Sequence, residues 1–318
     1  MDLLQMQYFL KIAETGNMTR AAEELYISQS SLSRTIARLE KDLGVKLFDR
    51  VGRQIQLNEF GKVFLHRTKQ AFMQLEEAQR EIADLRGQGN HKIQVGITIP
   101  GILTFFLDRY VSLQNQIQIS QYFIQRNQTV DFLTEGRADF VITADNIESS
   151  TIDWEFLVSD SILALVPEGH PLSKYTAISL SRLVGEPIVS TPPGYGIRPL
   201  IEDCFSSVGA APNIVFEESD PTLIFQLVQN GIGIGFISQH NLVNELRRTN
   251  CLDNPRIPGL AMCVITDSCA HMNVGIASLK NRYRSAQDTA FLKILKEYCQ
   301  DLLLVMQPED YAPPQNES

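Results

Sequence analysis

A cluster of side chains able to bind nucleic acid lies in the stretch SQSSLSRTIAR, residues 28–38. Drawn as a helix, this stretch turns an apolar face made of Leu32, Ile36 and the following Leu39 to one side. The opposite face holds Ser30, Ser33, Arg34 and Ala37, with Gln29 at the N-terminal end. Arginine can pair with guanine, glutamine with adenine, and serine with either base or with phosphate. The pattern also fits an ordinary solvent-exposed helix face capped by a serine.

The elements around this stretch decide between the two interpretations. Residues 3–15 and 18–26 have helical spacing, with a break at Gly16 and with Asn17 or Thr19 as the N-cap of the second helix. Ser28 and Gly44 suit the N-cap and C-cap of the third helix. The segment VKLFDRVGRQIQLN then reads as a hairpin with a basic tip. We therefore predict a winged helix-turn-helix DNA-binding domain over residues 1–58.

A long polar helix is predicted over residues 59–88. Its apolar positions follow one another at spacings of three and four, which is the seam of a helix that pairs with another helix. We expect dimerisation through this seam, although an amphipathic helix packed on its own domain remains an alternative. The seam comprises Phe64, Thr68, Ala71, Leu75, Ala78, Ile82 and Leu85.

Residues 92–305 alternate buried strands with helices, which indicates an α/β domain with mostly parallel sheets. Because this stretch is long for one such sheet, we expect two lobes. Lobe I takes about 92–160 and 267–305, and lobe II takes about 161–266. The polar, proline-containing residues 306–318 are predicted to be disordered.

Charge is distributed unevenly along the chain, whose net charge is −9. Residues 1–92 hold 14 Lys and Arg against 12 Asp and Glu, whereas the remainder holds 14 against 25. A local basic surface in the first part is therefore compatible with an acidic protein. We find no 18-residue apolar run and no signal peptide, so we expect a cytoplasmic protein without membrane contact.

The cysteines and histidines indicate no disulfide framework, metal site or cofactor. The five cysteines, all in the second half, are odd in number and include no C-x-x-C pair. No nucleophile-base pair or phosphate-binding loop is recognisable, so we expect no enzyme. Gly231, Gly233 and Gly235 are expected to permit tight sheet packing.

The stretch TRAAEELYISQSSLSRTIARLEKDLGVKLFDR, followed by LNEFGK and a long helix, resembles the N-terminal domain of LysR-type transcriptional regulators. The stretches LTEGRADFVIT, LVPEGHPL and LVQNGIGIGFIS resemble the effector domain of that family, so the resemblance spans nearly the whole chain. Positions that match the family pattern are Ala21, Ala22, Leu25, Ser28, Gln29, Leu32, Ser33, Ile36, Leu39, Glu40, Leu43, Gly44, Leu47, Phe48 and Arg50.

The resemblance implies roles for residues of the predicted DNA-binding domain. Gln29, Ser33 and Arg34 should read bases in the major groove, and Ser30 stands where many members have proline. Thr19 and Ser31 should hold phosphates, with Arg38 as a further phosphate contact. Arg53 should enter the minor groove, and Arg50 should be structural or bind phosphate. The partners implied are double-stranded DNA with partly palindromic sites, a second copy in a dimer or tetramer, and RNA polymerase.

The resemblance further implies a periplasmic-binding-protein-like effector domain with a small molecule between its lobes. Strand ends and the glycine- and proline-containing loops after them supply the candidate contacts. Arg198 and helix N-termini favour a carboxylate effector, although each residue can also be a structural cap or turn. The candidates are Thr98, Pro100, Gly101, Ala144, Asp145, Thr191, Tyr195 and Arg198.

Two other functions stay open from the sequence. A thiol-based redox regulator would need a cysteine pair, but Cys204 has no near neighbour in sequence, and Cys263 and Cys269 follow a strand. A small-molecule binding or transport protein would not need residues 1–88.

Overall fold

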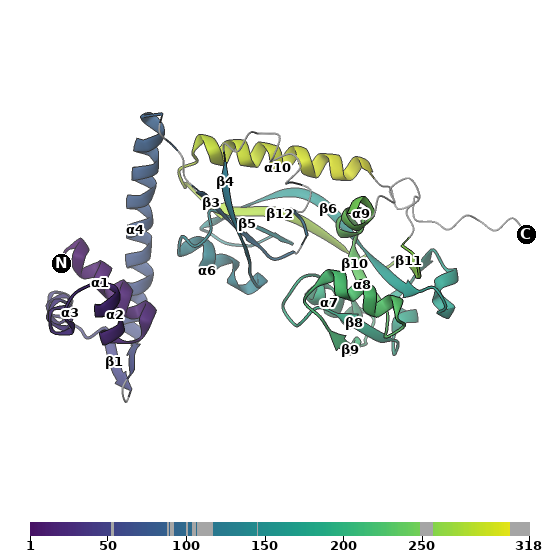
Figure 1. The fold of residues 1–318 in the computed structure, drawn as a ribbon, viewed down its shortest axis with the longest axis horizontal. Coiled ribbons are helices and arrows are strands. Elements are labelled where there is room, and N and C mark those ends of the chain that lie inside the picture. The colour runs from purple at the N-terminus through teal and green to yellow at the C-terminus, as the bar shows by residue number, and fades with distance from the viewer. Residues whose placement is uncertain are drawn as a thin grey trace, which may run out of the picture. The chain divides into compact units, whose positions relative to one another are not determined.

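The computed structural model describes residues 1–51, 54–87, 89, 92–99, 101–103, 106, 117–144, 146–248 and 257–305. Its residues divide into two compact units, one formed by Met1–Ile82 with Thr134–Gly136 and the other by the remainder (Figure 1). The predicted helix after residue 101 lies mostly outside the described residues. The predicted tail 306–318 lies outside them entirely.

The N-terminal unit begins with three short helices, α1 (Leu3–Thr15), α2 (Met18–Glu24) and α3 (Gln29–Leu43). Their ends are capped as the sequence predicts. Asn17 caps α2, Ser28 caps α3, and Gly16 and Gly44 end α1 and α3 in the left-handed conformation. Asp2 and Gln5 add a capping box at the start of α1.

A small apolar core holds these helices against the hairpin β1 (Phe48–Val51) and β2 (Gln54–Leu57). Phe9 lies at its centre, fully buried, with the rings of Phe48 and Phe64 at 5.3 and 4.9 Å. The core residues of the three helices and the following turn are Phe9, Ile12, Ala21, Ala22, Leu32, Ile36, Leu39 and Leu47.

The long helix α4 (Glu59–Leu85) starts against this core. Phe64 belongs to the core rather than to an exposed seam, which corrects its assignment to the dimer seam, and Thr68 is buried. The later seam positions Ala71, Leu75, Ala78, Ile82 and Leu85 are exposed. The exposed apolar stripe of α4 therefore begins at Ala71, about two turns later than the sequence predicted.

The second unit is an α/β domain built along one long strand, β6 (Ile152–Pro167). The first part of β6, as far as Ser161, pairs with β12 (His271–Leu279). From Ile162 onward β6 pairs with β10 (Gly235–Ser238) on one side and with β11 (Leu260–Ile265) on the other. The strand therefore leaves one sheet and enters the next between two neighbouring residues, and two lobes result.

Lobe I continues its sheet in the order β4 (Gln118–Phe123), β3 (Lys92–Ile97), β5 (Phe140–Ala144), β12 and β6. The helix α10 (Ala286–Val305) lies along this sheet, and Phe291 of α10 contacts Phe140 at 5.6 Å between ring centres (Figure 1). Through this contact the C-terminal helix packs on the sheet of β3, β5 and β12. The short helices η1 (Arg126–Gln128) and α6 (Thr129–Thr134) connect β4 to β5.

Lobe II surrounds the second part of β6 with β10, β11 and the short β7 (Ala177–Ile178). Two further strands, β8 (Pro187–Ser190) and β9 (Asn213–Glu217), join this group through a bridge between Ile188 and Ile234. Three helices complete the lobe, α7 (Arg198–Ser207), α8 (Pro221–Gln229) and α9 (Gln239–Arg248). The turns η2 (Pro171–Lys174) and η3 (Leu180–Leu183) precede β7 and β8.

The sheets are mixed, whereas the sequence led us to expect mostly parallel ones. β3 is parallel to β4 and β5, β7 is parallel to β11, and β8 is parallel to β9. However, β12 runs antiparallel to β5 and β6, and β10 and β11 run antiparallel to β6. The sequence prediction missed β12 and the first part of β6, the antiparallel neighbours that make the sheet of lobe I mixed.

Two of the three neighbouring glycines permit close packing, as predicted. A Cβ atom on Gly233 would lie 2.6 Å from the Pro187 carbonyl oxygen, and one on Gly235 would lie 2.8 Å from Val228. Gly231 instead takes a left-handed φ of +74° with open space around it. Among the helices of the described ranges, none has the length and hydrophobicity needed to span a bilayer.

Candidate DNA-binding surface and effector cleft

The exposed face of α3 carries the residues predicted to bind DNA. Leu32, Ile36 and Leu39 turn into the core, as the helical wheel predicts. On the other side, Ser33 is half-buried, and the remaining predicted residues Gln29, Ser30, Ser31, Arg34 and Arg38 are exposed. The helix therefore presents short polar side chains and two guanidinium groups without a bulky side chain between them.

The first turn of α3 is ordered by its own serines. Ser28 Oγ accepts a hydrogen bond from the Ser31 backbone N–H at 3.2 Å and lies 3.1 Å from Ser30 Oγ. Arg34 Nε donates to the Ser30 carbonyl oxygen at 3.3 Å. This bond holds Nε of the guanidinium group against the helix backbone. The serines thus cap the helix and position Arg34 at the same time.

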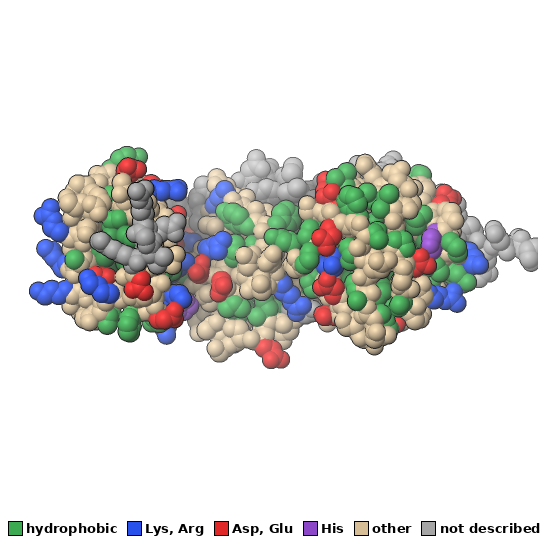
Figure 2. Space-filling model, turned by 90° about the horizontal axis from the view of Figure 1, so that it is seen from below, with side chains coloured by type: hydrophobic (Ala, Val, Ile, Leu, Met, Phe, Trp, Pro, Cys, Tyr) green, Lys and Arg blue, Asp and Glu red, His purple; other side chains and the backbone are tan. Residues whose placement is uncertain are grey.

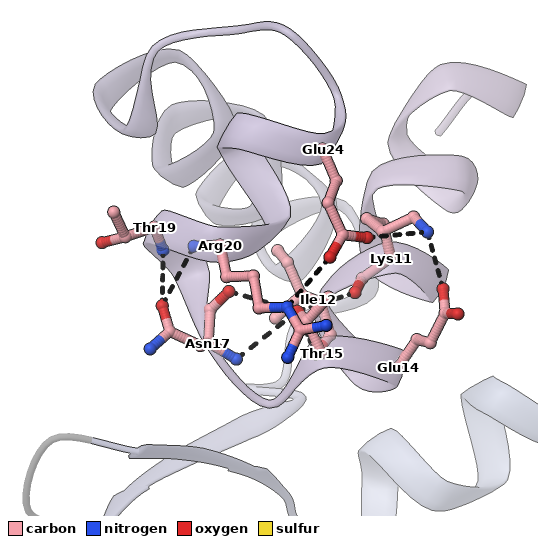
Figure 3. A network of polar contacts seen from close by, with 8 residues as sticks. All are labelled: Lys11, Ile12, Glu14, Thr15, Asn17, Thr19, Arg20 and Glu24. Carbon is pink, nitrogen blue, oxygen red and sulfur yellow. Dashed lines mark hydrogen bonds and ion pairs between the residues drawn. The ribbon is translucent and has the colours of Figure 1, made fainter.

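Polar contacts fix the turn between α1 and α2 (Figure 3). Asn17 Oδ1 accepts from the backbone N–H groups of Thr19 and Arg20 at 2.9 and 3.1 Å. Glu24 binds Arg20 at 2.9 Å and Lys11 at 3.3 Å. The Arg20 hydrogen bond lowers the pKa of the Glu24 carboxyl group, with a smaller contribution from Lys11. Thr19 itself is exposed at the N-terminus of α2, where its hydroxyl group can reach a phosphate.

Glu40 joins the end of α3 to the hairpin, a role that the family pattern did not reveal. Its carboxylate is buried and accepts from the Leu47 backbone N–H at 2.9 Å and from Lys46 Nζ at 2.6 Å. Asn58 adds a second link, because its Nδ2 donates to the Lys46 carbonyl oxygen and its Oδ1 caps Gly61 of α4. These contacts set the angle between α3 and the wing.

The hairpin pairs Arg50 with Ile55 and Val51 with Gln54. The predicted minor-groove residue Arg53 and the Arg50 side chain lie outside the described residues. Lys and Arg side chains project along the left edge of the N-terminal unit in Figure 2. This distribution agrees with a local basic surface on an otherwise acidic chain.

A hollow between the two lobes is lined by two of the predicted effector residues, both from lobe I, and by residues of lobe II that were not predicted. Thr98 and Ala144 line it from the ends of β3 and β5, and Gly194, Gly196 and Ile197 line it from the loop before α7. Thr98 Oγ1 donates to Thr143 Oγ1 at 3.0 Å. Its lone pairs can therefore accept a hydrogen bond from a ligand. The other lining residues are Arg126, Pro199, Leu200, Asp203 and Met272.

A second hollow adjoins the first and shares Gly196 and Ile197 with it. Its walls are mainly apolar, and its polar side chains are Thr191, Ser238 and Asn241. Ser238 and Asn241 were not predicted. Ser238 is the last residue of β10, and Asn241 lies in the first turn of α9, so no glycine- or proline-containing loop pointed to them. The apolar residues are Ile99, Leu165, Ile224, Phe225, Phe236 and Ile237.

Arg198 does not provide the carboxylate contact that the sequence suggested. Its guanidinium is buried and already binds two carboxylates, Glu202 at 2.6 Å and Glu217 at 3.3 Å. It also donates to the Thr191 carbonyl oxygen at 3.0 Å. Arg198 therefore ties the loop before α7 to α7 and β9 through its Nε and Nη1 groups.

Two other loop candidates have structural contacts of their own. Thr191 Oγ1 donates to the Tyr195 carbonyl oxygen at 2.9 Å, and the Tyr195 side chain is exposed. Gly101 takes a φ of +85°, and its carbonyl oxygen accepts from Asn244 Nδ2 at 3.0 Å. Pro100 and Asp145 lie outside the described residues. Of the predicted residues, Thr98 and Ala144 line the first hollow, and Thr191 lines the second.

A buried pair that no sequence signal revealed lies where β6 passes between the lobes. Asp160 accepts from the His240 backbone N–H at 3.2 Å, and its second oxygen contacts His240 Nδ1. His240 is at the start of α9, the helix whose Asn244 reaches Gly101 of lobe I. The pair thereby anchors α9 at the crossing.

Cys269 lies beside the helix that carries Cys204, although the two cysteines are distant in the sequence. Its sulfur accepts a hydrogen bond at 3.9 Å from Ser207 Oγ of α7. Cys263 and Cys299 are buried, and burial raises the pKa of Cys263 to about 11 and that of Cys299 to about 12. Across the described ranges, no group of His, Cys, Asp and Glu is arranged to hold a metal ion.

Comparison with protein families gives two matches that together span nearly the whole chain. The model described as "Bacterial regulatory helix-turn-helix protein, lysR family" matches residues 3–62. The model described as "LysR substrate binding domain" matches residues 86–300. The two domains therefore correspond to the DNA-binding and effector-binding parts identified above.

Individual relatives support the same assignment. The HTH-type transcriptional regulator YybE of Bacillus subtilis is 31% identical over 294 residues, which cover 90% of this chain and 94% of YybE. The HTH-type transcriptional activator CmpR of Synechocystis is 32% identical over 249 residues, covering 76% and 81%. The crystal structure of CbnR, a LysR family transcriptional regulator, has a TM-score of 0.63 at 19% identity and covers 94% of this chain and 99% of CbnR.

Proposed function

Since this chain belongs to the LysR family of transcriptional regulators, we propose that α3 reads its operator through Gln29, Ser33 and Arg34. The exposed polar face of α3 is the observation that carries this proposal. Arginine and glutamine give the bidentate base contacts that specify sequence, and the short serines let the helix approach the groove floor. Ser30 is a further candidate at the N-terminal end.

Other residues position the protein on the phosphates. Thr19 at the start of α2 and Ser31 at the start of α3 are exposed at helix N-termini, where backbone N–H groups add positive potential. Arg38 lies further along α3, and Arg50 and Arg53 belong to the wing. We assign these residues to backbone contacts, with Arg53 in the adjacent minor groove.

A dimer would place two copies of α3 against one DNA site. The exposed apolar stripe of α4, from Ala71 to Leu85, supports pairing of two such helices. The site is then partly palindromic, with two half-sites about one or more helical turns apart. We further propose that the dimers can pair into a tetramer and that the protein contacts RNA polymerase in the cytoplasm.

The effector site of the substrate-binding domain is proposed in the two adjoining hollows. Thr98, Ala144 and the 194–197 loop supply polar atoms and backbone groups, and the second hollow supplies an apolar wall. Because Arg198 is engaged by Glu202 and Glu217, we favour an effector with an apolar part over one bound through a carboxylate on Arg198. Ligand binding between lobes would bias one lobe arrangement over another and so alter DNA geometry.

The proposed domain boundaries divide the chain into three parts. We assign residues 1–58 to the DNA-binding domain, 59–88 to the linker helix, and 92–305 to the effector domain. The change of pairing partner in β6 between Ser161 and Ile162 supports the proposed boundary between lobe I and lobe II.

Footprinting tests the proposed function directly. Purified full-length protein should protect two half-sites in successive major grooves of the promoter region flanking its own gene, and protection should survive excess competitor DNA. Protection that spreads evenly along any DNA would argue against base reading by α3.

A further inference from the structure

Ser238 lines the second hollow and lies against a buried acid–base pair. It is the last residue of β10, and its side chain is fully buried. Its Oγ lies 3.1 Å from His240 Nδ1. The same Nδ1 contacts Asp160 Oδ2, and Asp160 Oδ1 accepts from the His240 backbone N–H at 3.2 Å. One imidazole nitrogen therefore has two oxygen neighbours, the Ser238 hydroxyl and the Asp160 carboxyl group.

The Asp160 contact determines what the Ser238 hydroxyl group can do. A ring nitrogen of histidine offers one site, either an N–H group or a lone pair. Asp160 Oδ2 is the nearer of the two oxygens, so this site is used by Asp160 whichever of the pair carries the proton. Among the described residues, Ser238 Oγ has no other hydrogen-bond partner. The Ser238 O–H group is therefore available as a donor to a molecule in the hollow.

Thr191 supplies the complementary acceptor in the same hollow. Its Oγ1 donates to the Tyr195 carbonyl oxygen at 2.9 Å, so the lone pairs of Oγ1 remain available. A hydroxyl or carboxamide group can use both residues, because it accepts one hydrogen bond and donates another. A carboxylate group only accepts and would leave Thr191 without a donor.

The surroundings of Ser238 and Thr191 are apolar and hold no cation. None of the described residues that line the second hollow is charged, and six of them have aliphatic or phenyl side chains. With one proton between them, Asp160 and His240 carry no net positive charge. A carboxylate placed here would lose its hydration without gaining a counter-charge, which is strongly unfavourable.

We propose that the second hollow binds an uncharged, mainly hydrocarbon effector whose hydroxyl or carboxamide group bonds to Ser238 and Thr191. This inference rests on the proposed function, since it takes the space between the lobes as the effector site. It adds the chemical class of the effector and makes Ser238 a determinant of specificity. The buried Asp160–His240 pair acts through Ser238, by leaving the proton of its hydroxyl group to the ligand.

Matched pairs of small molecules that differ only in charge test the proposal. The probes are benzamide with benzoate, and cyclohexanecarboxamide with cyclohexanecarboxylate, each titrated into full-length protein by calorimetry. We expect each amide to bind at least about tenfold more tightly than its acid and to raise the melting temperature. Ser238→Ala should weaken binding of the amides roughly tenfold, because one buried hydrogen bond is lost.

Ser190→Ala is the matched control. Ser190 is a buried serine at the end of β8 in the same lobe, and it is not among the residues that line either hollow. Its replacement should leave amide binding unchanged. Thermal unfolding without ligand shows whether each variant folds. Ser238→Cys is the second variant, since it retains a side chain of similar size with a weaker donor and should also bind the amides less tightly.

Three outcomes overturn the proposal, namely acids that bind as tightly as the amides, no binding of either amide, and unchanged amide binding in Ser238→Ala. Arg126 lines the first hollow, so Arg126→Gln identifies the first case. Acid binding that is lost in Arg126→Gln would place the polar end of the effector in the first hollow and retain the cleft as the effector site. Footprinting of the unliganded protein tests operator reading separately.

Discussion

Arg34 is the residue on which base reading depends most in this account. Arg34 is exposed on α3, and its Nε donates to the Ser30 carbonyl oxygen. This bond fixes the position of Nε and leaves the two terminal nitrogens to extend away from the helix. Arg38 lies one turn later on the same helix and is assigned to a phosphate. The two arginines therefore have the same charge and different expected roles.

Replacing each arginine separates these roles. Arg34→Ala should weaken operator binding by about 1–3 kcal/mol and relax specificity at one base pair. Arg38→Ala should weaken operator and random DNA alike and make the salt dependence shallower. Fluorescence anisotropy on operator and scrambled duplexes measures both effects. Equal losses on both duplexes for Arg34→Ala would assign it to phosphate instead.

A second prediction concerns Glu40, whose replacement should lower the stability of the folded protein. Glu40→Gln should cost about 1–3 kcal/mol, because the buried bond from the Leu47 N–H is no longer charge-assisted and an amide N–H₂ group is placed where only acceptors are needed. Urea unfolding of the full chain measures the loss. Glu14→Gln, which removes an exposed pair with Lys11, is the control and should change stability little. Equal stability of both variants would contradict the role of Glu40.

At the scale of elements, Gly61 sets how closely α4 can approach the hairpin. A Cβ atom there would lie 2.1 Å from the Leu47 carbonyl oxygen, which is backbone and cannot turn away. Gly61→Ala should therefore destabilise the N-terminal unit by roughly 1–3 kcal/mol, since α4 must shift. Gly169→Ala, with open space around it, is the matched control. Thermal unfolding compares the two, and a neutral Gly61→Ala would show that α4 moves freely.

The exposed apolar stripe of α4 predicts that two copies of the chain dimerise through this helix. Leu75→Asp should yield monomers in sedimentation equilibrium, because a charge would enter a paired apolar seam. Glu76→Lys on the other side of α4 should leave the oligomer intact. A tight dimer that persists in Leu75→Asp would move the interface elsewhere.

Most helices and their caps could be predicted from the sequence, because capping residues and apolar spacing are local signals. Ser28 and Gly44 bound α3 as expected. The mixed sheets could not be predicted, since the pairing of β12 with β6 depends on residues far apart in the chain. The same reason hid three features of the site, namely the carboxylates that occupy Arg198, the Asp160 contact of His240 and the approach of Cys269 to the helix that carries Cys204.

At the scale of the whole molecule, the chain joins a DNA-binding domain to a two-lobed effector domain through α4. The chain passes between lobes along β6 and again between β11 and β12. The cleft lies beside these crossings, so a bound ligand would act on the arrangement of the two lobes. A bias of a few kcal/mol in the equilibrium between lobe arrangements is enough to change operator affinity.

Operator binding as a function of salt concentration tests the central claim most directly. We predict that full-length protein binds the promoter region of its own gene with nanomolar affinity, and that a large difference from scrambled DNA persists as salt rises, because base contacts are less screened than phosphate contacts. Arg34→Ala should lose most of that difference. Affinities for operator and scrambled DNA that fall together with salt, in the wild type as in the variant, would contradict base reading by α3.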